Sequence, residues 1–167
     1  ICQLVKLFKN GKPFKMSKRA GDFISAQDLL SEVDKDPIRF MMLNRSNDVE
    51  IDFDFDKVKE KTKDNPVFYV QYAYARINSI LRTLDMSFIK NIKLDKIDLN
   101  FNEMEEKIIR KVFEWPKIIE SASRKFDLHK IPFYLYELST LFHAYWSRGN
   151  EDKRYRFIEN EQIKRKE

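Results

Sequence analysis

The sequence is poor in the residues that mark several protein classes. It has one cysteine, Cys2, so an internal disulfide is excluded and the chain suits a reducing compartment. Three glycines and five prolines leave little room for flexible linkers or low-complexity segments. No apolar run reaches the roughly 18–20 residues that cross a bilayer. The two histidines, His129 and His143, lie too far apart in sequence to indicate a metal site.

Other absences concern targeting and catalysis. No secretory pattern opens the chain, which begins Ile1-Cys2, and we expect a cytoplasmic piece of a longer protein. No Ser/His/Asp or Cys/His set has suggestive spacing, which argues against a hydrolase. The content of 43% hydrophobic and 35% charged residues in 167 positions is typical of one compact domain, or of one with an appended hairpin.

Positive charge is concentrated at the two ends of the chain. The first 21 residues contain no acid and six basic residues, which are Lys6, Lys9, Lys12, Lys15, Lys18 and Arg19. The C-terminal end repeats this bias between Lys153 and Lys166, with acids interleaved. Such patches suit a polyanion, while a solvated lysine-rich surface explains the charge alone equally well.

A β-hairpin is expected at the start of the chain. Residues 4–8 and 13–16 flank Asn10-Gly11, which favours a type I′ turn because both turn positions need positive φ. The hairpin leads into residues 15–19, where two lysines three apart adjoin a serine and an arginine. A loop of this composition can wrap a polyphosphate. The alternative is an exposed basic turn.

Two short helices and an acidic–aromatic segment should follow. Ser25 with Asp28 forms a capping-box pattern, and Asp36-Pro37 is typical of a helix start. Residues 52–56 alternate aspartate with phenylalanine. A calcium loop would need glycine and glutamate where this sequence has lysines, so we interpret the segment as a short edge strand or a helix entry.

Three apolar stripes predict long helices that pack as a bundle. The first follows the cap signal Asn65-Pro66 and consists of Val67, Val70, Tyr74, Ile77, Leu81 and Leu84. The second contains Pro116, which should divide it, and consists of Met104, Ile108, Val112, Trp115, Ile119, Ala122 and Phe126. The third has Pro132 near its start and consists of Leu135, Leu138, Phe142 and Tyr145. We expect Val70, Ile77 and Leu81 to be buried against the other stripes.

The expected helices also carry aromatic residues outside the stripes, namely Tyr69, Tyr72, Tyr136 and Trp146. Aromatic residues beside arginines can stack on unpaired RNA bases. Tyr72 and Arg76 are the preferred pair for RNA binding, because residues four apart share one helix face. Core packing of Tyr72 and a surface ion pair for Arg76 are the alternatives.

Several segments, in order along the chain, resemble one enzyme family. Residues 15–19, KMSKR, resemble the KMSKS signature of class I aminoacyl-tRNA synthetases. Residues 36–40, DPIRF, are similar to the motif that names the DALR anticodon-binding domains, with proline for alanine and isoleucine for leucine. Residues 65–77, NPVFYVQYAYARI, together with 134–138 and 142–143, resemble bacterial arginyl-tRNA synthetases. The matches cover nearly the whole chain, which is identified as a C-terminal portion of that family.

The resemblance implies a mainly α fold in two parts. Residues 1–60 would end the catalytic domain with a small β-hairpin, the KMSKS-like loop and linker helices, and residues 61–167 would form a helical anticodon-binding bundle. The full-length enzyme would attach arginine to its tRNA at the expense of ATP. Lys15 and Lys18 would be catalytic, because they would stabilise charge on the departing pyrophosphate. The ATP-binding loop would comprise Lys15, Met16, Ser17, Lys18 and Arg19.

The same resemblance implies the partners of the full-length enzyme: tRNA(Arg), ATP with Mg²⁺, and L-arginine. We expect no metal site, no tightly bound cofactor and no membrane partner for this chain, and a monomeric state. Tyr72 and Arg76 would then contact tRNA.

Two departures limit what this chain could do alone. The family's domain with the HIGH motif would precede Ile1 and is not in this sequence. The family's last helical segment, expected after about Asn160, is missing or is replaced by the charged residues 159–167. We therefore expect weak tRNA binding and no aminoacylation by this chain. The alternative is a non-catalytic tRNA- or RNA-binding module derived from a class I synthetase, which would have no need for the lysine pair. A helical protein–protein adaptor would leave the basic loop unexplained.

Overall fold

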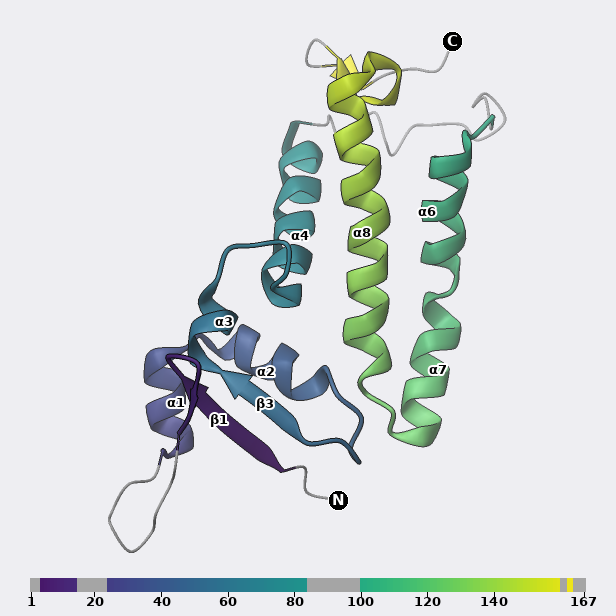
Figure 1. The fold of residues 1–167 in the computed structure, drawn as a ribbon. Helices are drawn as coiled ribbons and strands as arrows, with labels where there is room; N and C mark the ends of the chain where they lie inside the picture. Colours follow the sequence, from purple (N-terminus) through teal and green to yellow (C-terminus); the bar gives the residue numbers. More distant parts are fainter. Residues whose placement is uncertain (1–3, 15–23, 84–99, 160–161, 164–167) are drawn as a thin grey trace, which may run out of the picture. The chain divides into compact units, whose positions relative to one another are not determined.

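The computed structural model describes residues 4–14, 24–83, 100–159 and 162–163 (Figure 1). The chain is mainly α, as expected, and divides into two compact units: residues 1–69 with 116–136, and residues 70–115 with 137–167. The predicted ATP-binding loop, Lys15 to Arg19, lies outside the described residues, and so does Leu84.

The first unit contains the predicted hairpin and a small sheet. Strand β1 (Val5–Lys9) pairs antiparallel with the short β2 (Lys12–Pro13). Between them Asn10 and Gly11 have φ of 53° and 67°, which confirms the type I′ turn. Strand β3 (Ile51–Asp54) pairs parallel with the other side of β1, so the strand order is β2-β1-β3.

The connection from β2 to β3 carries two helices, α1 (Ala26–Glu32) and α2 (Lys35–Leu43). Ser25 and Asp28 form the predicted capping box. Helix α2 begins one residue earlier than the sequence indicated. Strand β3 passes directly into α3 (Phe55–Lys59), which confirms the interpretation of residues 52–56 as a strand and a helix entry.

The core of the first unit lies between the sheet and these helices. Its buried side chains are Val33, Ile51, Phe53, Phe55 and Val58. Phe53 is fully buried, and its ring meets that of Phe55 edge-on with centroids 5.5 Å apart. The alternation of residues 52–56 therefore has a simple cause: the phenylalanines enter the core, and Asp54 caps α3 by accepting from the backbone N–H groups of residues 56 and 57.

A buried asparagine joins α3 to the start of α4 (Pro66–Thr83). Asn65 is 6% exposed, and its amide nitrogen donates to the carbonyls of Val58 at 2.9 Å and Glu60 at 2.7 Å. Its amide oxygen accepts from the N–H of Val67 at 3.1 Å and so caps the helix. Both ends of the side chain are thus satisfied by backbone groups.

The first unit also holds α7 (Trp115–Lys125) except its first residue, and the beginning of α8 (Lys130–Glu151). Phe126 has a φ of 56° just past the end of α7, and its carbonyl accepts from the amide of Asn47 at 3.4 Å. The rings of Tyr69 and Tyr136 lie 5.3 Å apart.

The second unit is a helical bundle followed by a short C-terminal segment. Helix α8 lies between α4 and α6 (Glu103–Phe113) in Figure 1. Asn102 and Glu105 form a capping box at the start of α6. The chain after α8 forms the 3₁₀ helix η2 (Lys153–Tyr155) and a hairpin of β4 (Ile158–Glu159) and β5 (Gln162–Ile163).

The sequence identified the helices of the bundle better than their buried faces. The predicted break at Pro116 is confirmed by the division into α6 and α7, and Phe142 and Tyr145 of α8 are buried. The expectation for α4 is wrong, because Ile77 is 39% exposed and Leu81 is 44% exposed. The buried position in this part of α4 is Ala73.

The second apolar stripe, which runs along α6 and α7, is also less buried than its helical period indicated. Val112, Ile119 and Phe126 are all at least 38% exposed, whereas Ala122 is buried. None of the helices in the described ranges combines the length and the apolarity needed to cross a membrane.

Candidate functional site

The predicted pair Tyr72 and Arg76 lies together on α4. Nη2 of Arg76 donates to the hydroxyl of Tyr72 at 2.7 Å, and Cζ of Arg76 lies 4.1 Å from the centroid of the Tyr72 ring. Residues one helical turn apart are neighbours on the helix surface, which brings the two side chains together. Tyr72 is 41% exposed, so it does not have the core position that was the alternative.

Helix α8 supplies two further side chains, His143 and Trp146. Cζ of Arg76 lies 4.7 Å from the centroid of the Trp146 ring. Nη1 of Arg76 lies 3.4 Å from Nδ1 of His143, whose ring stacks on Tyr72 with centroids 5.5 Å apart. We call these four residues the Arg76 cluster. The guanidinium of Arg76 lies against two aromatic rings, whose π faces attract its positive charge.

The contact between Arg76 and His143 depends on the tautomer of the imidazole. A guanidinium has donors and no acceptor, so the contact is a hydrogen bond only when Nδ1 of His143 is unprotonated. His143 is 6% exposed, so its ring is enclosed by the residues around it. The ring lies beside both Arg76 and Tyr72 and packs the cluster against α8.

Arg76 differs from two nearby arginines, each of which pairs with an acidic side chain. Arg148 pairs with Glu151 at 2.9 Å, and Arg154 pairs with Asp152 at 2.8 Å. The hydrogen bonds from Arg154 lower the pKa of Asp152 to about 2. Arg76 has no carboxylate within ion-pair distance in the part of the chain that the structure describes. Its positive charge is therefore not neutralised locally by a described acid.

Lys6 and Lys9, near the N-terminus, form ion pairs with acidic side chains, unlike Arg76. Lys6 pairs with Glu50, and Lys9 donates to both carboxylate oxygens of Glu32 at 2.9 and 3.0 Å. The hydrogen bond from Lys9 holds the pKa of Glu32 below its usual value. These ion pairs reduce the charge that the hairpin can offer to a polyanion. The predicted loop residues, Lys15 to Arg19, lie outside the described residues and are not placed.

Sequence reasoning proposed Tyr72 and Arg76 and named Trp146 as an aromatic candidate, but it did not connect them with His143. The helical period places His143 and Trp146 on one side of α8. It does not give the register of α8 against α4, which creates the cluster. Among the described residues, no group of three or more His, Cys, Asp or Glu side chains could hold a metal ion.

Comparison with known proteins places this cluster within a domain family. The family model of the DALR anticodon binding domain matches residues 70–167, which include all four members. The arginine–tRNA ligase of Pelagibacter ubique is 56% identical over 164 residues, covering 98% of this chain and 28% of that protein. The arginine–tRNA ligase of Ruegeria pomeroyi is 51% identical over 164 residues, covering 96% and 28%. The chain thus spans little more than a quarter of these relatives.

A solved structure resembles the fold described above. It is a crystal structure from Campylobacter jejuni that carries the provisional name arginyl-tRNA synthetase. Its TM-score is 0.76 at 27% sequence identity, over 89% of this chain and 32% of that one. Because the domain match extends over more than half of the sequence, the chain belongs to the DALR anticodon binding domain family.

Proposed function

We propose that this chain is the tRNA-binding part of an arginine–tRNA ligase and that it contacts the anticodon loop through the Arg76 cluster. The domain match over residues 70–167 and the names of the two bacterial relatives support the proposal. Anticodon bases are unpaired, so their faces are open to stacking and their edges to hydrogen bonding.

One observation carries the proposal: Arg76 lies against the rings of Tyr72 and Trp146 without a described carboxylate partner. A cation in this state can bind a phosphate of the RNA backbone. Tyr72 is 41% exposed beside its contacts with Arg76 and His143, and the exposed part of its ring would contact a base; such stacking is worth about 1–3 kcal/mol per base. Phosphate contact then supplies affinity, and stacking supplies selection.

The proposal extends to catalysis in the full-length enzyme. Lys15 and Lys18 would stabilise charge on the departing pyrophosphate when arginine attacks the α-phosphate of ATP, with Arg19 beside them and with Met16 and Ser17 shaping the loop. Placed cations of this kind are worth about 2–4 kcal/mol in a transition state. Mg²⁺ would arrive with ATP as its counter-ion. The substrates would be ATP, L-arginine and tRNA(Arg).

The non-catalytic RNA-binding module is not favoured. Relatives that are 56% and 51% identical carry the ligase name, and this chain has the lysine pair that a module without catalysis would not need. The single cysteine fits the cytoplasm, where we place a monomeric protein.

The test is a binding series at fixed salt with an arginine tRNA and with the same tRNA carrying a replaced anticodon. We expect wild type to prefer the first, and Tyr72→Ala and Arg76→Ala to lose the preference. Arg82→Ala is the matched control, because Arg82 is an exposed arginine on α4 outside the cluster. Equal affinity of wild type for both RNAs would contradict anticodon binding. A preference that survives in Tyr72→Ala and Arg76→Ala would exclude those residues only.

A further inference from the structure

The hairpin of β1 and β2 is bonded to two helices of the first unit at the end where it turns. The backbone N–H of Asn10 donates to Oδ2 of Asp56 at 2.6 Å, and Asp56 lies in the first turn of α3. Nζ of Lys9, the last residue of β1, donates to both carboxylate oxygens of Glu32, the last residue of α1. Both helices lie beside the turn in Figure 1. Two carboxylates therefore hold the hairpin through charge-assisted hydrogen bonds.

These contacts join the two sides of one chain segment. Residues 15–23, which include the proposed ATP-binding residues, lie outside the described ranges; the hairpin precedes them and α1 follows them. The backbone N–H of Phe14 donates to a carbonyl of β1 at 2.7 Å, so the pairing of the hairpin extends to the residue before this segment. The ion pair of Lys9 with Glu32 thus connects the element before the segment to the element after it.

A second ion pair on β1 has a different position. Lys6 pairs with Glu50, which directly precedes β3. Because β3 is hydrogen-bonded to β1, this pair joins two strands that the sheet already holds together. A strand and a helix form no common backbone ladder, so the pair of Lys9 with Glu32 adds a polar link to the apolar packing between β1 and α1. The two lysine side chains are similarly exposed, at 53% and 43%, which makes Lys6 a matched control for Lys9.

The carboxylate of Asp56 has its contact with the hairpin and is not the cap of its own helix. Asp54 caps α3. The ladder between β1 and β2 ends before the turn, so the N–H of Asn10 needs another acceptor, and Asp56 supplies it. Nζ of Lys59 on α3 lies 3.9 Å from Oε2 of Glu32. The hairpin, α1 and α3 therefore meet around these two carboxylates.

We propose that Lys9, Glu32 and Asp56 are positioning residues for adenylate formation, and that they fix the hairpin before residues 15–23 relative to the helix after them. The proposal rests on the proposed function and deepens it. Cations stabilise a transition state only when they are held where its charge develops, and a displacement of about 1 Å can cost on the order of 100-fold in rate. The three residues contact no substrate and act through the chain on either side of the segment.

The experiment measures pyrophosphate exchange with ATP and arginine in the full-length enzyme. Lys9→Ala and Glu32→Ala should each lower kcat by about 5- to 20-fold and leave KM for arginine within about twofold of wild type. The double variant should be no slower than the slower single variant, because both changes remove the same contact. Lys9→Arg keeps donors for the carboxylate and should restore most of the rate. Lys6→Ala should exchange at the rate of wild type.

Asp56 is tested in the same assay. Asp56→Asn keeps a side-chain oxygen that accepts from the N–H of Asn10, so it should retain more of the rate than Asp56→Ala. Urea unfolding separates positioning from folding. Lys9→Ala and Lys6→Ala each remove an exposed ion pair and should lose similar, small amounts of stability, so that they differ in exchange rate alone.

Three results would overturn the positioning role and leave the proposed function intact. The first is an exchange rate of Lys9→Ala equal to that of Lys6→Ala. The second is a double variant in which the two losses multiply, and the third is a raised KM for arginine at unchanged kcat. If the wild-type enzyme does not exchange pyrophosphate in the presence of arginine and ATP, the catalytic part of the proposed function fails, and the positioning role fails with it.

Discussion

The hydroxyl of Tyr145 donates to Oε1 of Glu105 at 2.9 Å and joins the middle of α8 to the first turn of α6. The other carboxylate oxygen of Glu105 accepts from the backbone N–H of Asn102 at 2.9 Å, which completes the capping box. One side chain thus closes the start of a helix and fixes that helix to its neighbour. Tyr145 is 5% exposed, so its hydroxyl needs partners within the protein, and Glu105 is one of them.

This contact predicts a loss of stability at high pH. Burial, and then the hydrogen bond to Glu105, raise the pKa of Tyr145 from 10.0 to about 12. The folded state therefore holds the phenolic proton more tightly than the unfolded state, so the stabilisation is complete below pH 10.0 and is lost as the pH approaches 12.

The check is urea unfolding of wild type and Tyr145→Phe from pH 8 to 12. The stability advantage of wild type over the variant should shrink above pH 10, because phenylalanine has no proton to lose. Tyr74→Phe is the control, since Tyr74 is 70% exposed, and it should follow wild type. An advantage that is constant across this range would contradict the coupling.

Asn65→Ala should be strongly destabilising. The change removes two bonds to backbone carbonyls and the cap of α4 and leaves buried polar groups without partners. The expected loss is about 2–4 kcal/mol in the free energy of unfolding. Asn47→Ala, which removes one exposed bond of 3.4 Å, should change it by less than about 0.5 kcal/mol. Equal effects of the two variants in urea unfolding would exclude a structural role for Asn65.

Burial predicts opposite outcomes for two apolar residues. Phe53→Ala would leave a cavity in the core of the first unit and should cost about 3–5 kcal/mol. Ile77 is 39% exposed, so Ile77→Ala should cost less than about 1 kcal/mol. Denaturant unfolding of the two variants measures the contrast. A loss of several kcal/mol in Ile77→Ala would show that the residue packs more closely than its exposure indicates.

These contrasts show which structural features the sequence could predict. The turn at Asn10-Gly11, the capping box at Ser25 and the helix break at Pro116 depend on backbone geometry within a few residues, and each was predicted correctly. The buried side of α4 was not, because an apolar period cannot tell a helix that packs through Ala73 from one that packs through Ile77.

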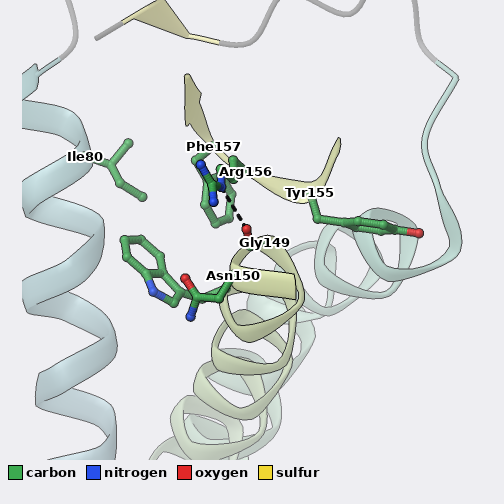
Figure 2. Close-up of a pocket in the computed structure, with 7 residues that line it drawn as sticks. Ile80, Gly149, Asn150, Tyr155, Arg156 and Phe157 are labelled. Atoms are coloured by element: carbon green, nitrogen blue, oxygen red, sulfur yellow. Dashed lines mark hydrogen bonds between the residues drawn. The ribbon is translucent and has the colours of Figure 1, made fainter. Parts of the chain in front are cut away.

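The same limit applies to the candidate site. The pairing of Tyr72 with Arg76 follows from their spacing on one helix, so the sequence could predict it. His143 and Trp146 join the cluster only because α8 lies against α4 in a particular register. The return of the chain after α8 depends further on Gly149, where a Cβ atom would lie 3.0 Å from the carbonyl oxygen of Tyr155 (Figure 2). Long-range register of this kind has no local signal.

Replacement of Tyr72 and replacement of Arg76 should weaken tRNA binding in different ways. Tyr72→Phe keeps the ring beside Arg76 and loses the hydrogen bond of 2.7 Å, so most of the affinity should remain. Tyr72→Leu loses the stacking face, which should cost about 1–3 kcal/mol without changing the salt dependence. Arg76→Ala should lower the slope of log K against log salt by about 1. Titrations at several salt concentrations separate these effects, and identical salt slopes in all variants would contradict a phosphate contact by Arg76.

The last prediction concerns the KMSKS-like loop in the full-length enzyme. Lys18→Ala should slow formation of the arginyl-adenylate by about 100- to 1,000-fold, because a placed positive charge matters most where charge develops in the transition state. Binding of arginine should change little, since arginine carries no phosphate that Lys18 could contact. Pyrophosphate exchange measures the first effect, and equilibrium binding of arginine measures the second. Lys12→Ala removes the same charge from an exposed position in β2 and should leave the exchange rate near that of wild type. If Lys18→Ala exchanges pyrophosphate at the rate of Lys12→Ala, Lys18 has no part in catalysis.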